Sequence, residues 1–71
     1  MSVVTDYAVA GMTCGHCVAA VTEELSALPG VTGVVVDLVG GGVSAVHVTS
    51  AQILDAAAVR AAVDEAGYEL T

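Results

Sequence analysis

Three stretches of the chain carry residue patterns that are typical of β-strands. In the stretch from Val3 to Val9, Tyr7 and Val9 alternate with Asp6 and Ala8, which predicts a half-buried strand. Two later stretches, Val31–Val39 and about Val43–Thr49, are rich in β-branched residues and predict two more strands. The three glycines of Gly40–Gly42 lie between them and predict a hairpin turn, because glycine tolerates the positive φ that such turns need.

Two other stretches carry apolar residues at spacings of three and four, which predicts helices with one buried stripe each. The first runs from Val18 to Leu28 and ends at Pro29-Gly30. The second begins after Asp55, a residue type that caps helix N-termini, and is closed by Gly67 as a C-terminal cap. The stripes comprise Val18, Val21, Leu25 and Leu28 in the first helix, and Val59, Ala62, Val63 and Ala66 in the second.

A short segment, Tyr68–Leu70, follows the second helix and is long enough for an edge strand only. The order of elements is therefore βαββαβ. Two strand–helix–strand units with right-handed crossovers predict an α+β fold, in which a four-stranded antiparallel sheet carries both helices on one face. The other face is expected to be open to solvent and to hold Asp6, Asp37 and His47. With 71 residues, the chain is expected to form a single domain.

Composition and charge exclude several classes of function. The chain is 56% hydrophobic, but no stretch supplies the roughly 18 uninterrupted apolar residues of a membrane span. The formal charge is −7, from eight acidic residues against Arg60 alone. A basic patch for nucleic acid or for an anionic membrane surface therefore cannot form. The charge is consistent with a partner that has a basic face, and equally with solubility alone.

The N-terminus has neither the positive charge nor the continuous apolar stretch of a signal peptide. We therefore expect a cytoplasmic protein, in which thiols are kept reduced. A structural disulfide between the two cysteines of the chain, Cys14 and Cys17, is then not expected. Two close cysteines in such a protein indicate metal binding or redox catalysis.

The two cysteines lie in Gly11–Cys17, whose sequence is Gly-Met-Thr-Cys-Gly-His-Cys. Cys17 should lie in the first turn of the first helix and Cys14 just before it, so that both sulfurs converge near the positive helix end, which favours thiolate. Two thiolates suit a soft monovalent ion such as Cu(I) and leave it open to an incoming thiol. Structural zinc needs about four ligands, and His16 and His47 do not complete a zinc-finger spacing.

This motif and its surroundings resemble the heavy-metal-associated (HMA) domain family, and most of all its bacterial CopZ-type copper chaperones. The resemblance rests on Gly11–Cys17, on Leu28–Val31 after the first helix and on Ala66–Tyr68 after the second. It covers essentially the whole chain, from about Tyr7 to Leu70. It implies a ferredoxin-like fold and a single HMA domain over residues 1–71.

The resemblance also implies a copper metallochaperone and not an enzyme. Cys14 and Cys17 would hold Cu(I) and pass it by thiolate exchange to a copper-transporting P-type ATPase, with a copper-responsive repressor as a possible second recipient. At high copper, a metal-bridged homodimer is expected, because two-coordinate copper on an exposed loop can accept thiolates from a second copy.

The family pattern suggests roles for residues around the thiols. Met12 would pack under the metal loop as a core anchor and not as a ligand. Tyr68 would approach the loop and shield it, while also serving as an ordinary core aromatic. Thr13 stands where zinc and cadmium pump domains often carry an acidic residue, which favours copper. His16 either faces solvent, or tunes the thiols, or supplies a ligand in a dimer. His47 is expected to be an exposed strand residue.

Three alternatives remain open at this stage. Cys-Gly-His-Cys is also the active-site tetrad of thioredoxin-like oxidoreductases, but this chain has no tryptophan, and its one proline, Pro29, ends the helix that starts at the thiols. The same fold could carry Hg(II) or Zn(II), although mercury-binding relatives carry a signal peptide that is not seen here. The chain could also be an excised ATPase domain, while its start at Met1 and its end soon after the last strand favour a free-standing protein.

Overall fold

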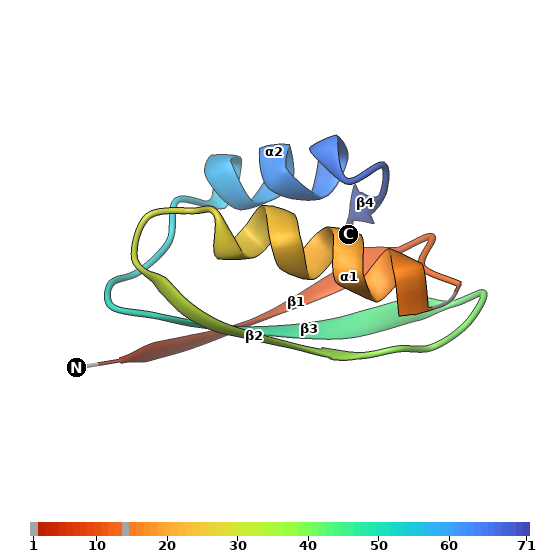
Figure 1. The fold of residues 1–71 in the computed structure, drawn as a ribbon, viewed down its shortest axis with the longest axis horizontal. Helices are drawn as coiled ribbons and strands as arrows, with labels where there is room; N and C mark the ends of the chain where they lie inside the picture. The colour runs from red at the N-terminus through yellow and green to blue at the C-terminus, as the bar shows by residue number, and fades with distance from the viewer. Residues whose placement is uncertain (1, 14) are drawn as a thin grey trace.

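The helices and strands follow the predicted order βαββαβ (Figure 1). The computed structural model describes residues 2–13 and 15–71. Within these residues the elements are β1 (Val3–Ala10), α1 (Gly15–Ser26), β2 (Val31–Asp37), β3 (Val43–Ser50), α2 (Ala56–Glu65) and β4 (Glu69–Leu70). No helix in the described ranges has both the length and the apolar character needed to cross a membrane.

The strands form one sheet in the order β2-β3-β1-β4, and each described pair of neighbours is antiparallel. Both helices cover the same face of this sheet (Figure 1). The predicted ferredoxin-like α+β architecture is therefore confirmed. In the register of the sheet, Asp6 of β1 pairs with His47 of β3, which pairs on its other side with Val35 of β2.

The hydrophobic core lies between the helices and the covered face of the sheet. On β3 the side chains alternate, so that Val46 and Val48 are buried while His47 is only partly covered. The two predicted helical stripes are confirmed, although Val18 and Leu28 are only half-buried. The buried apolar residues are Val9, Met12, Cys17, Val21, Leu25, Val46, Val48, Val59, Ala62 and Val63.

Helix α1 ends earlier than the apolar stripe predicts. Its last residue is Ser26, whereas the stripe continues to Leu28. The Leu28 N–H donates to the Leu25 carbonyl at 3.1 Å, an i→i−3 bond that tightens the chain before Pro29. Leu28 still packs against the core, but it does so from the turn that follows α1 and not from the helix itself.

Strand β2 is also shorter than predicted, because it ends at Asp37 and not at Val39. The Val39 carbonyl instead accepts a hydrogen bond from the Gly42 N–H at 3.1 Å, which closes a turn. Gly41 within this turn has φ +77°, which confirms the reason for expecting glycine there. At the start of α2, the Asp55 carboxylate accepts from the Ala57 N–H at 3.0 Å, so the predicted N-cap is confirmed.

Candidate metal centre

Residues 11–13 follow the end of β1, and Gly15–Cys17 form the first turn of α1, at one end of the long axis of the molecule (Figure 1). Cys14 lies outside the described residues, so its role as a ligand stays a prediction. The described neighbours on either side of Cys14 show the surroundings that the chain provides for a thiol pair.

Cys17 is the third residue of α1, as the sequence predicts, and only 8% of it is exposed. Its Sγ lies 3.7 Å from the Thr13 hydroxyl oxygen, within hydrogen-bonding distance for sulfur. The first turn of a helix has backbone N–H groups that point out of the helix end and carry partial positive charge. The described first turn of α1 holds no carboxylate that would offset this charge. The positive end of α1 therefore lies beside Cys17.

Met12 is fully buried and belongs to the hydrophobic core. This burial agrees with its predicted packing role. The thioether fills space beneath the loop, where an unbranched, polarisable side chain adapts readily to its neighbours. Met12 therefore anchors the segment between β1 and α1 to the core.

Tyr68 approaches Gly11 from the C-terminal end of α2, because this helix ends in a Schellman turn. The Gly67 N–H donates to the Asp64 carbonyl at 2.9 Å, and the Tyr68 N–H to the Val63 carbonyl at 3.1 Å. Gly67, one residue beyond the cap, adopts φ +92°. The half-buried ring of Tyr68 then lies so close to Gly11 that an added Cβ there would be 3.5 Å from Tyr68 Cδ1. Tyr68 therefore lies beside Gly11 and packs against the core as well, and its role in shielding the metal stays a prediction.

The hairpin between β2 and β3 also approaches the loop, which the sequence reasoning missed. A Cβ added to Gly40 would lie 3.6 Å from the Thr13 carbonyl oxygen. The pairing of Val43 with Ala10, the residue before the loop, is the reason for this proximity. The predicted strand lengths could have indicated this proximity, because antiparallel pairing of β1 with β3 brings the start of β3 to the end of β1.

The two histidines lie in different surroundings. His16 is exposed on α1, and its effect on the thiols stays a prediction. His47 lies on the open face of the sheet, as predicted, between Asp6 and Asp37. Its Nδ1 is 2.6 Å from Asp6 Oδ1 and its Nε2 is 3.0 Å from Asp37 Oδ2. Hydrogen bonds to Asp6 and then to Asp37 raise the pKa of His47 above 6.5.

The sequence analysis placed these three residues on one face but did not foresee their bonds. Both ring nitrogens of His47 are engaged by carboxylates. His47 and its two carboxylate partners lie on the sheet face away from the helices. They are therefore separate from Thr13 and Cys17 and are not part of the candidate metal centre.

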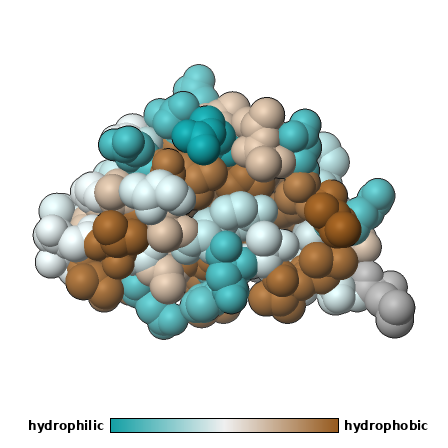
Figure 2. Space-filling view, turned by 180° about the vertical axis from the view of Figure 1, so that it is seen from behind, coloured by the Kyte–Doolittle hydropathy of each residue, from teal (hydrophilic) through white to brown (hydrophobic). Residues whose placement is uncertain are grey.

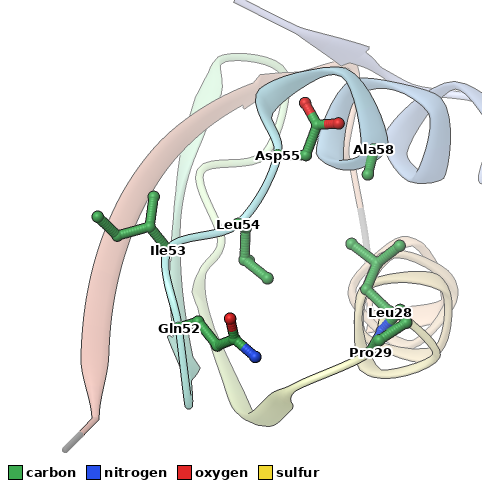
Figure 3. A pocket seen from close by; sticks show the side chains of 7 residues that line it. All are labelled: Leu28, Pro29, Gln52, Ile53, Leu54, Asp55 and Ala58. Atoms are coloured by element: carbon green, nitrogen blue, oxygen red, sulfur yellow. The ribbon is translucent and has the colours of Figure 1, made fainter.

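An open groove occupies the opposite end of the molecule (Figure 3). Its lining comes from the end of α1 and from the connection between β3 and α2. The lining residues are Leu28, Pro29, Gln52, Ile53, Leu54, Asp55 and Ala58. None of these side chains is a thiol, an imidazole or a thioether, so the groove offers no soft metal ligand.

The heavy-metal-associated domain model matches residues 6–69, which is nearly the whole chain. The chain belongs to the heavy-metal-associated domain family. This HMA domain is 30% identical to a CopZ metallochaperone of known structure, with 97% of this chain and 100% of that one covered and a TM-score of 0.83. The likeness supports a metal chaperone of the CopZ type.

Two further relatives extend the comparison. A CsoZ metallochaperone has a TM-score of 0.78 at 21% identity, covers 100% of this HMA domain and 99% of its own chain, and shows that the fold is shared. Copper-transporting ATPase 1 of Rhizobium meliloti (strain 1021) is 42% identical over 65 residues, which make up 92% of this chain. The HMA domain spans only 8% of the length of that ATPase.

Proposed function

We propose that this HMA domain is a Cu(I) metallochaperone in which Cys14 and Cys17 bind the metal. The observation that carries the proposal is the position of Cys17, in the first turn of α1 and beside the Thr13 hydroxyl. Cys14 precedes it by three residues in the sequence. Two thiolates at a positive helix end suit a soft monovalent cation.

Transfer proceeds by thiolate exchange, with copper remaining Cu(I) throughout. A thiolate of the recipient donates a lone pair to the two-coordinate copper and forms a third Cu–S bond. The Cu–S bond to Cys14 or Cys17 then breaks, and the departing thiolate keeps its electron pair. One repetition moves the ion to the recipient. The Thr13 hydroxyl can donate a hydrogen bond to the Cys17 thiolate as it leaves.

The proposed recipient is a copper-transporting P-type ATPase. The 42% identity with a segment of Copper-transporting ATPase 1 supports it, because that segment corresponds to a domain of the same kind. A cytoplasmic location, a single-domain chain and a carrier without catalytic activity belong to the same proposal. A copper-responsive repressor as a second recipient and a copper-bridged homodimer stay predictions.

The decisive test is competition and transfer with the reduced protein. We expect about one Cu(I) per chain, held far more tightly than Zn(II) in competition with chelators specific for each ion. The ion should move to purified Copper-transporting ATPase 1 on mixing. Serine variants Cys14→Ser and Cys17→Ser should lose this binding, while Ser26→Ala on the exposed end of α1 should keep it. Preferential Zn(II) binding would overturn the assignment to copper.

An insulin-reduction assay tests the thioredoxin-like alternative. The antiparallel sheet and the family match do not favour that alternative. The HMA domain should show no sustained turnover with dithiothreitol as reductant, with thioredoxin as the positive control. Sustained turnover that disappears in Cys14→Ser would mean that the thiols work as a redox pair.

A further inference from the structure

Three exposed apolar residues gather on the hairpin between β2 and β3, here called the hairpin tip: Leu38, Val39 and Val43. Their exposed fractions are 39%, 52% and 52%. The nine residues from Leu38 to Val46 include no charged side chain, in a chain whose formal charge is −7. Figure 2 shows hydrophobic surface at both ends of the long axis of the molecule. The hairpin tip therefore stands out as an uncharged, apolar surface at the end that carries the metal loop.

The hairpin tip is continuous with the candidate metal centre. Gly40 lies against the Thr13 carbonyl, and Val43 pairs with Ala10, the last residue of β1 before the loop. A protein that brings its own thiols to the metal must come to this end of the molecule. The hairpin tip lies next to Ala10 and Thr13 at this end, within reach of such a protein.

Hydrogen bonds hold the hairpin tip in one shape. The Val39 N–H donates to Ser44 Oγ at 2.9 Å, and the Gly42 N–H donates to the Val39 carbonyl at 3.1 Å. Ser44 is fully buried, so this anchor connects the tip to the core. A cross-turn contact adds to it, because a Cβ on Gly42 would lie 3.1 Å from Val39 Cγ1. A preformed surface loses little conformational entropy when a partner covers it.

We propose that the hairpin tip is a docking surface for the metal-binding domain of the copper-transporting ATPase, which rests on the proposed function. Leu38, Val39 and Val43 form the apolar contact, next to Ala10 and Thr13. The partner should present a complementary apolar area with a basic rim, because this chain carries eight acidic residues against one arginine. Covering the tip also removes water next to the exchanging thiolates.

The groove at the other end supplies a matched control. Ile53 beside that groove is 85% exposed and points away from it (Figure 3). Ile53 belongs to the connection between β3 and α2, which lies at the opposite end of the molecule from the start of α1 (Figure 1). Changing Ile53 alters exposed apolar surface without touching the proposed docking surface.

The test compares the double variant Val39→Thr/Val43→Thr with Ile53→Thr. Threonine keeps the β-branched shape and replaces one methyl group by a hydroxyl, so folding should be preserved. Copper transfer to the purified ATPase is followed by separating the two proteins by size. We expect transfer from the double variant to be about tenfold slower, with Cu(I) affinity unchanged, because apolar contacts near the centre of an interface contribute strongly to binding. Ile53→Thr should transfer at the wild-type rate.

Amide signals of the ¹⁵N-labelled chain provide a second measurement. On addition of the ATPase, signals of residues 38–43 should broaden while that of Ile53 stays sharp. Wild-type transfer by the double variant, or unaffected signals at residues 38–43, would overturn the docking proposal. A loss of Cu(I) affinity in the double variant would do so as well, because the tip would then act on the metal site and not on the partner. Failure of the wild-type chain to bind or transfer copper would instead overturn the proposed function.

Discussion

His47 on β3 and Asp6 on β1 form a close cross-strand pair, with His47 Nδ1 2.6 Å from Asp6 Oδ1. The other ring nitrogen meets Asp37 on β2 at 3.0 Å. A protonated imidazole donates from both nitrogens, so it joins β1, β3 and β2 across the open face of the sheet. The hydrogen bond to Asp6 and, with a smaller effect, the hydrogen bond to Asp37 raise the pKa of His47.

The stability of the apo protein should therefore depend on pH through His47. The pKa is raised in the folded state, so the folded chain holds the proton more tightly than the unfolded chain. The stabilisation is fully present below the ordinary value of 6.5 and is lost as the pH rises through the raised pKa. Urea unfolding should show wild type more stable than His47→Gln in mildly acidic buffer, and the difference should shrink above that pKa.

The other histidine provides the control for this measurement. His16→Gln removes the other imidazole of the chain, which is exposed on α1, and leaves the sheet face unchanged. The difference between wild type and His16→Gln should vary much less with pH. A His47→Gln difference that is constant with pH, or that grows as the pH rises, would contradict the bridge.

The two carboxylates should contribute unequally to the pKa of His47. Asp6→Asn should lower this pKa more than Asp37→Asn, because the bond to Asp6 is shorter and has the larger effect. Imidazole proton shifts in an NMR titration report the pKa directly. Asp64→Asn on exposed α2 makes the same charge change away from the imidazole and should leave the pKa nearly unchanged. Equal effects of all three variants would mean that only net charge matters.

Met12 should act through packing alone. Met12→Ala removes a fully buried side chain and should lower the free energy of unfolding by about 2–5 kcal/mol. Met12→Leu conserves volume and should cost less than about 1.5 kcal/mol while keeping Cu(I) affinity. Thermal unfolding and chelator competition measure the two effects. Loss of Cu(I) affinity in a stably folded Met12→Leu would identify the thioether as a ligand.

The Thr13 hydroxyl should strengthen copper binding through Cys17. Thr13→Val keeps the shape of the side chain but removes the group that lies 3.7 Å from the sulfur. Cu(I) affinity should fall about three- to tenfold. This loss is smaller than that of a typical hydrogen bond to a charged group, because the contact is long. Thr13→Ser keeps the hydroxyl and should therefore keep most of the wild-type Cu(I) affinity. If Thr13→Val binds copper as well as wild type does, the contact has no part in holding the metal.

The predictable parts of the fold depend on short-range patterns. Alternation along β3 and the helical stripe through Val21 and Leu25 identify the buried faces, because each element needs one apolar side to cover the core. The ends of the elements were less predictable. Leu28 is apolar because it packs on the core from a turn, and Val39 is β-branched but belongs to the hairpin.

The candidate centre was predictable where the motif is local and not where the chain returns to it. The position of Cys17 follows from residues adjacent in sequence. The approach of Gly40 to Thr13 and the bonds of His47 to Asp6 and Asp37 depend on strand register instead. Register is set by pairing across the whole sheet, so no single segment of the sequence contains it.

The central claim is that two sulfurs, from Cys14 and Cys17, hold one Cu(I). X-ray absorption of the protein loaded with one equivalent of Cu(I) measures the number and kind of ligands directly. We predict two sulfur ligands in the monomer, and loss of this signature in Cys14→Ser and in Cys17→Ser. A copper site with nitrogen or oxygen ligands in place of sulfur, or an unchanged spectrum in either serine variant, would contradict the account.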